Sequence, residues 1–114
     1  MNGGQGPKAT ALGKRSGYDN QGEGSVAIGY NAGYDDQGAG AIAIGRESGY
    51  TTQPANAIAI GNLAGGTASQ TASSIILSAT GVQLGDGGNA GFIVDPVRES
   101  TNSKSLYYNT TSKE

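Results

Sequence analysis

The sequence predicts an all-β protein in the form of a parallel β-roll, a two-sided solenoid of about five coils. Three observations predict this fold. A short motif, an apolar residue, alanine, a second apolar residue and glycine, recurs every 16 residues. Its large side chains occupy alternate positions, which is the period of a strand and not of a helix. Stretches rich in glycine, asparagine and aspartate separate the copies and are typical of tight turns.

The repeat extends beyond the motif itself. The four regular copies of the motif begin at Thr10, Val26, Ile42 and Ile58. A glutamine opens each unit, at Gln5, Gln21, Gln37 and Gln53. A fifth unit opens one residue late, at Gln70, and we expect the extra residue in the turn around Ala68 and Ser69. Units this small cannot bury an apolar face alone, so each must pack on its neighbours.

Equivalent strands should stack in parallel about 4.8 Å apart, so that like residues form columns. The expected structural columns are Val26, Ile28, Ile42, Ile44, Ile58, Ile60, Ile75 and Leu77. The expected turn glycines are Gly13, Gly29, Gly45 and Gly61. One interpretation places the branched columns inside the roll and the alanines on its surface, and the reverse arrangement stays open. A second strand in each unit is expected near positions such as Glu47–Tyr50.

Two segments are predicted along the chain. Residues 1–84 form the repeat roll, with residues 5–20 as a more polar terminal coil that acts as a cap and residues 70–84 as the last coil. Residues 85–114 form a connector with two short strands, around Phe92 and around Tyr107. We expect Phe92 and Tyr107 to pack between chains, and a hairpin within one chain is the alternative.

Composition limits the possible functions. The net charge is −2, and there are 21 glycines but no cysteine and no histidine. Disulfides, thiolate metal sites and the commonest general base are therefore excluded, and we expect no enzyme, cofactor or metal. No apolar run reaches the roughly 18 residues of a membrane span, and the N-terminus lacks a signal-peptide pattern. We therefore expect no membrane insertion. We also expect no nucleic-acid binding, because acidic residues outnumber basic ones.

The segments 24–34 and 56–65 resemble the head repeats of trimeric autotransporter adhesins. That resemblance implies a left-handed parallel β-roll in which three chains pack around an axis. The longer unit, with Gly-Tyr and Gln-Gly in its turn, is more similar to tail-fibre and capsid-fibre repeats of phages and large DNA viruses. The stretches 74–81, 91–98 and 106–114 resemble the closing segment of such fibres. In those proteins this segment often leads into a trimerisation chaperone that cleaves itself off, and nothing in this sequence matches that chaperone.

Other candidate sites have simpler explanations. Asp35 and Asp36 lack a repeated calcium pattern and are expected to be solvated turn carboxylates. Tyr18, Tyr34 and Tyr50 form a column in successive turns, which predicts an aromatic stack that either covers the turn edge or contacts sugar rings.

The predicted function is that of a virion structural protein, a rigid homotrimeric fibre or spike segment for host attachment on the virion surface or tail. Its expected partners are other copies of itself, further virion proteins and a host-surface glycan or receptor. The alternative is the head of a bacterial cell-surface adhesin of the trimeric autotransporter type. A non-adhesive solenoid such as an ice-binding roll is the alternative of another class.

Overall fold

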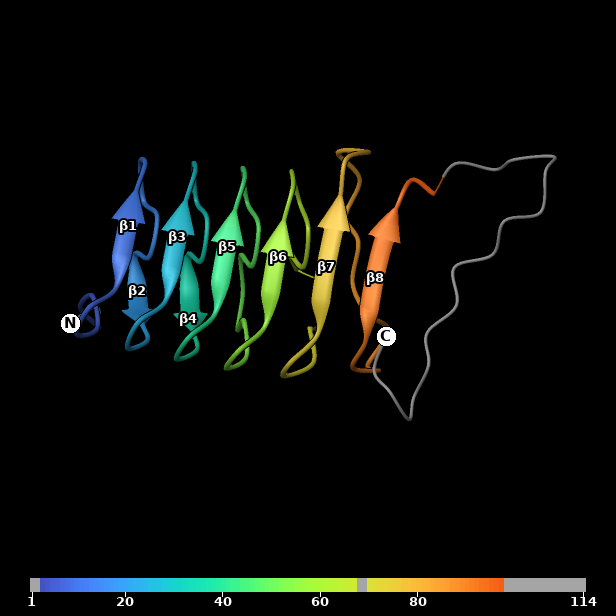
Figure 1. Cartoon of the computed structure of the whole chain (residues 1–114). Helices are drawn as coiled ribbons and strands as arrows, with labels where there is room; N and C mark the ends of the chain where they lie inside the picture. Colours follow the sequence, from blue (N-terminus) through green and yellow to red (C-terminus); the bar gives the residue numbers. More distant parts are fainter. Residues whose placement is uncertain (1–2, 68–69, 98–114) are drawn as a thin grey trace, which may run out of the picture.

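A computed structural model describes residues 3–67 and 70–97 of the chain, and these residues contain strands and turns but no helix. Six strands form one parallel sheet in the order β1-β3-β5-β6-β7-β8, so each strand lies beside the strand of the next coil (Figure 1). The strands are β1 (Thr10–Leu12), β3 (Val26–Ile28), β5 (Ile42–Ile44), β6 (Ile58–Ile60), β7 (Ile75–Ser78) and β8 (Phe92–Asp95). The predicted all-β solenoid of stacked parallel strands is confirmed.

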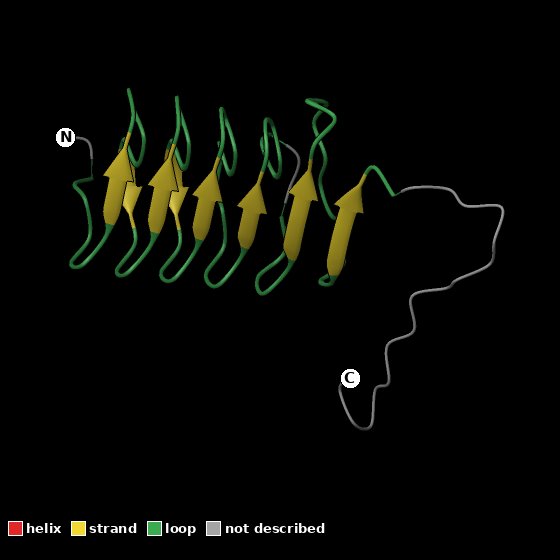
Figure 2. Ribbon diagram, turned by 45° about the horizontal axis from the view of Figure 1, so that its top comes forward, coloured by secondary structure: helices red, strands yellow, loops and turns green. Residues whose placement is uncertain are grey.

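The other side of the roll is less regular. Strands β2 (Asp19–Gln21) and β4 (Asp35–Gln37) form a parallel two-stranded sheet behind the larger one (Figure 2). Isolated bridges from Gln5 to Gln21 and from Asp35 to Thr51 extend this side by one coil in each direction. The second strand therefore follows the tyrosine of each unit, whereas the sequence placed it at positions such as Glu47–Tyr50. The glycine and the tyrosine of that stretch belong to the turn before it.

The strand register matches the repeat. Val26 pairs with Ile42 and Ile42 with Ile58, each a step of 16 residues. The fifth coil is one residue longer, because Ile58 pairs with Ile75. The position expected for the extra residue, at 68–69, lies outside the described residues.

The sheet continues past residue 84. Strand β8 pairs in parallel with β7, so that Ile75 aligns with Phe92 and Leu77 with Val94. The strand expected to belong to a separate connector is thus a sixth rung of the same sheet, where a rung means one strand of the stack. Tyr107, its expected hairpin or interchain companion, lies outside the described residues.

In β3, β5 and β6 the middle alanine points into the roll, whereas Ala11 of the first strand is exposed. Ala27, Ala43 and Ala59 are fully buried, as is Ile76 in the next rung. The roll has little room inside: a Cβ placed on Gly49 would lie 3.2 Å from the Cβ of Ala43. In the regular coils alanine fills this interior position and the branched columns lie on the outside, so the structure has the reverse of the arrangement considered first from the sequence.

Glutamines connect the two sides of the roll from within. Gln37 and Gln53 are each no more than 2% exposed. The Gln37 Nε2 donates to the carbonyl oxygen of Val26 at 2.8 Å and to the Oε1 of Gln53 at 3.1 Å. Gln53 repeats both contacts, with Ile42 at 2.9 Å and Gln70 at 3.3 Å. These side chains satisfy strand carbonyls that face the interior and bond one coil to the next, as buried polar groups require.

Candidate functional site

The outward face of the six-stranded sheet is apolar, and no strand among residues 3–67 and 70–97 packs over it. It consists of two rows, one at the beginning of the strands and one near their ends. The first row is Thr10, Val26, Ile42, Ile58, Ile75 and Phe92. The second row is Leu12, Ile28, Ile44, Ile60, Leu77 and Val94.

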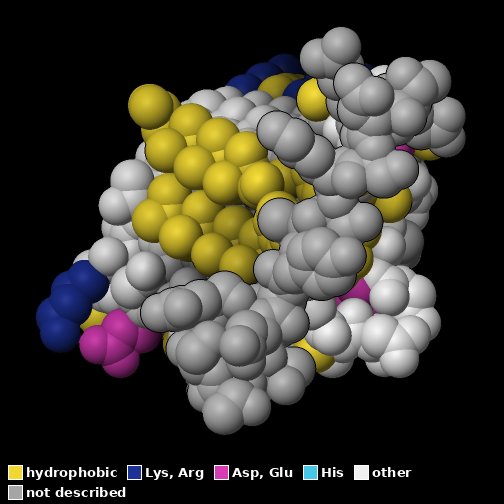
Figure 3. Space-filling view, turned by 45° about the vertical axis from the view of Figure 1, so that its right-hand side comes forward, with side chains coloured by type: hydrophobic (Ala, Val, Ile, Leu, Met, Phe, Trp, Pro, Cys, Tyr) yellow, Lys and Arg dark blue, Asp and Glu magenta, His cyan; other side chains and the backbone are white. Residues whose placement is uncertain are grey.

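These rows carry no charged side chain, and Thr10 is their only polar member. Most central members are half-buried and Ile60 is 37% exposed, whereas Leu12 is 66% exposed and Phe92 56% exposed at the two ends. Figure 3 shows hydrophobic side chains gathered in one continuous area on this face. Large exposed apolar areas of this kind mark interaction surfaces.

Glycines keep the end of each strand close to the next coil. Gly29 and Gly45 have φ of +129° and +122°, a region that other residues rarely adopt. A Cβ on Gly45 would lie 2.6 Å from the carbonyl oxygen of Gly61, and Gly29 has the same relation to Gly45. The expected turn glycines Gly13, Gly29, Gly45 and Gly61 thus form a column directly beyond the second row.

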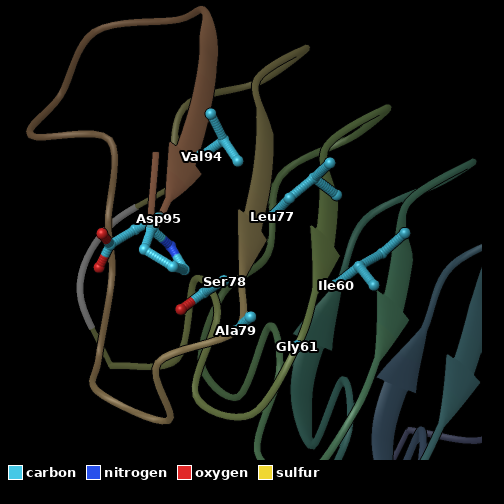
Figure 4. A pocket seen from close by; sticks show the side chains of 8 residues that line it. Ile60, Gly61, Leu77, Ser78, Ala79, Val94 and Asp95 are labelled. Atoms are coloured by element: carbon cyan, nitrogen blue, oxygen red, sulfur yellow. The ribbon is translucent and has the colours of Figure 1, made fainter. Parts of the chain in front are cut away.

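The outward face is hollowed at its C-terminal end. A hollow of about 290 Å³ lies beside the last members of the second row. Its lining residues are Ile60, Gly61, Leu77, Ser78, Ala79, Val94, Asp95 and Pro96 (Figure 4). The Leu77 and Val94 side chains stand along it, and the Asp95 carboxylate points away from them in Figure 4. The lining is therefore chiefly aliphatic, which suits an apolar side chain better than a polar ligand.

The predicted tyrosine column is a face-to-face stack. The rings of Tyr18 and Tyr34 are 5.1 Å apart between centroids and 5° from parallel, and those of Tyr34 and Tyr50 are 5.0 Å apart and 7° from parallel. Both faces of the Tyr34 ring are thus covered by other tyrosines. Because a sugar stacks on an open aromatic face, this geometry favours a structural role for the central ring.

Most charged groups on the turns are exposed, apart from the half-buried Glu47, which pairs with Arg46 at 3.1 Å, and the buried Asp86. Lys8 and Glu23 approach to 3.5 Å, but both side chains are more than half exposed, so this pair contributes little to stability. The Asp36 carboxylate accepts a hydrogen bond from Asn20 at 2.8 Å. Within the described ranges, no three His, Cys, Asp or Glu side chains are grouped as a metal site requires.

Asp86 is the one carboxylate held in a specific cradle in the part of the chain that the structure describes. Burial would raise its pKa, but the backbone N–H groups of Thr71 and Gly88 donate hydrogen bonds to it and lower the pKa. The hydrogen bonds outweigh the desolvation and hold the pKa of Asp86 below its usual value. Through its bond to Thr71, Asp86 connects the chain after β7 to the start of the fifth coil, next to Gln70, the last glutamine of the interior column.

Sequence reasoning did not assign a role to the buried glutamines. Gln21, Gln37, Gln53 and Gln70 served only to mark where each unit opens, although an amide at one fixed phase of a repeat is itself a signal of an interior polar column. The hollow left no signal in the repeat, because it depends on Ala79 and Pro96, which lie outside the motif.

Comparison with known proteins identifies one similar family. The model of the YadA head domain repeat matches the chain in two copies, with residues 21–32 as the matched range. No curated protein and no solved structure gives a significant match. No helix in the described residues could cross a membrane. The family match and the β-solenoid together fit a head of the trimeric autotransporter type.

Proposed function

We propose that the chain is a non-catalytic attachment module, the rigid head of a homotrimeric adhesin on a bacterial cell surface. The observation that carries the proposal is the outward face, with its two uncharged rows of mainly branched side chains running along the whole roll. YadA-like heads form homotrimers, and the repeat match is to that family. This supports the bacterial alternative over the viral fibre that the longer repeat unit suggested.

Self-association follows from where the apolar side chains lie. The interior is filled by alanine, glutamine and glycine, so the roll itself buries few of its large aliphatic groups. Covering the outward face would bury the remaining area of Val26, Ile42, Ile44 and their equivalents, at roughly 25 cal/mol per Å². Three chains around an axis parallel to the roll place like rungs at one height and leave the turns outside.

Attachment would use those outer turns. Their side chains differ from coil to coil, and the three-fold arrangement presents each turn three times. Linked copies raise avidity without any new contact, so weak individual binding to a host-surface glycan or receptor suffices. The stacked tyrosines serve as scaffold in this proposal.

Measurement of the molar mass in solution by light scattering tests the assembly. We expect three times the 11.3 kDa of one chain. A folded monomer at micromolar concentration would contradict the proposal, because it would show that the chain is stable with its apolar outward face exposed to water.

A viral fibre remains the second candidate, and the observation that favours it is the resemblance of residues 91–98 to fibre closing segments. In that setting the same trimer would contact other virion proteins. Antibody labelling in electron micrographs separates the two candidates: label on bacterial cells supports the adhesin, and label on virus particles or tails supports the fibre.

A further inference from the structure

We propose that Phe92 of each protomer inserts into the hollow on the neighbouring protomer and so fixes the alignment of the chains along the trimer axis. The hollow is the one lined by Leu77, Ala79, Val94 and Pro96 at the C-terminal end of the outward face. This inference rests on the proposed trimer and adds to it one specific contact and its role.

The central rungs cannot set the alignment by themselves. The first row reads valine, isoleucine, isoleucine over β3, β5 and β6, and the second row reads isoleucine in all three. A protomer displaced by one rung, about 4.8 Å, would meet almost the same side chains. Alignment therefore needs a residue that differs from the repeat and a matching feature on the partner.

Phe92 is such a residue. It is the single phenylalanine in the chain, and it stands in the first row where the earlier coils carry valine or isoleucine. Its side chain is 56% exposed on the last described rung, which is unusual for the largest apolar group of the outward face. Aromatic residues set into pockets at the centre of interfaces contribute most to binding.

The hollow is the matching feature. It lies at the height of β6 to β8 and opens beyond the ends of these strands, where Gly61 and Ala79 leave space. Ser78 directs its Oγ to the Oγ1 of Thr80 at 3.2 Å, so its polar atom is already partnered. An aromatic ring can enter without leaving a buried polar group unpaired.

Cyclic symmetry brings the two features together. In a closed ring of three chains the contact is heterologous, so the first row of one protomer faces the second row of the next at the same height. Phe92 cannot fill the hollow of its own chain. Ser78 aligns with Asp95, so Ala79 lies beyond the far end of β8, about four residues or roughly 13 Å from Phe92.

Cysteine cross-linking tests the contact cleanly because the chain has no cysteine. In the double variant Phe92→Cys/Ala79→Cys, a disulfide within one chain is excluded, since the Cα atoms must come within about 7 Å. We expect oxidation to give a covalent trimer on non-reducing gels. The matched controls are the two single variants and Phe92→Cys/Asp36→Cys, whose second cysteine lies on β4 behind the sheet, and these should give no covalent trimer.

The outcomes separate this inference from the proposed function. A wild-type trimer in which the double variant forms no interchain disulfide would overturn the Phe92 contact and leave the trimer intact. A wild-type monomer would overturn both. Cross-linking of Ala79→Cys to Tyr107→Cys within one chain would show that the chain's own C-terminal segment fills the hollow, which also overturns the proposal.

Loss of the ring provides a second measurement. We expect the Phe92→Ala trimer to dissociate at a lower temperature than wild type, with an unchanged circular dichroism spectrum. Val82→Ala is the matched control, since Val82 is 65% exposed but is not a member of either row. Equal dissociation temperatures for Phe92→Ala and wild type would contradict the inference.

Discussion

At the scale of single residues, the motif glycines are the positions where successive coils leave no space for a side chain. Each motif glycine has no side chain because the carbonyl oxygen of the next coil occupies the space where its Cβ would lie. The same residue has a backbone conformation that only glycine adopts easily. Two independent constraints therefore act on one position.

Gly45→Ala should destabilise the chain by at least about 2 kcal/mol, because the strained φ and the contact with Gly61 act together. Urea unfolding followed by circular dichroism measures the change. Gly91→Ala is the control, since a Cβ there meets nothing within 4 Å and the φ of Gly91 is not in the left-handed region. A Gly45 variant as stable as the Gly91 variant would show that neighbouring coils are not so closely stacked.

Asp86 predicts a pH dependence. Because its pKa is lowered in the folded chain, its contribution to stability is present above the unfolded value, 3.8, and is lost as the pH falls through the folded pKa. We expect the wild-type melting temperature to fall below about pH 4. Asp86→Asn should melt lower at neutral pH but lose less on acidification, whereas the exposed Asp36→Asn should follow wild type. An Asp86→Asn protein with the wild-type acid response would exclude this carboxylate as the cause.

At the scale of the strand, the middle residue of β3, β5 and β6 is inside the roll and its two neighbours are outside. Ala43 is fully buried in the roll, while Ile42 and Ile44 on either side of it face outward. The interior and the proposed interface are thus separated by one position along the same strand. Adjacent substitutions should affect folding and assembly differently.

Ala43→Asp should prevent folding of the roll, because it buries an unpaired carboxylate beside Gly49. Ile44→Asp should leave the roll folded and abolish the trimer, because the charge then lies on the outward face. Circular dichroism measures the fold and light scattering measures the mass. A trimeric Ile44→Asp protein with normal melting would show that this face is not the interface.

The motif strands β1, β3, β5, β6 and β7 and their register could be predicted from the sequence, but the direction of their faces could not. Alternation fixed which residues share a face, and the 16-residue spacing fixed which residues pair. The usual rule that large aliphatic residues lie inside fails in the regular coils, because the two sides of the roll come close together there: a Cβ added to Gly49 would lie 3.2 Å from the Cβ of Ala43. The space available inside depends on the distance between the two sides of the roll, and the sequence of a single strand does not determine that distance.

At the scale of the whole molecule, each coil contacts chiefly the coils before and after it. Stability should therefore be close to a sum over coils and their contacts. The sixth rung escaped prediction because Phe92-Ile93-Val94 has neither the alanine nor the glycine of the motif. Its 17-residue distance from Ile75 repeats the step of the previous coil and is the one signal it offers.

Deletion of residues 42–57 removes one full unit and joins Ala41 to Ile58, so every column stays in register. We expect a folded protein with a lower melting temperature and the same type of circular dichroism spectrum. Deletion of residues 42–49, half a unit, should leave the chain unfolded, because strand residues of one coil would then stack on turn residues of the next. If both deletions behave alike in thermal melts, the coils are not independent stacking units.

The turns separate backbone shape from side-chain identity. Lys8, Asn56 and Ser73 occupy equivalent corners with φ between 58° and 62°, and Gly24 and Gly40 have φ of 64° and 66° at the same corner. The same backbone conformation at this corner, which forms a constant frame, therefore carries a cation, an amide, a hydroxyl or no side chain at all. Such a frame can acquire new surface chemistry at this corner without any change in the path of its backbone.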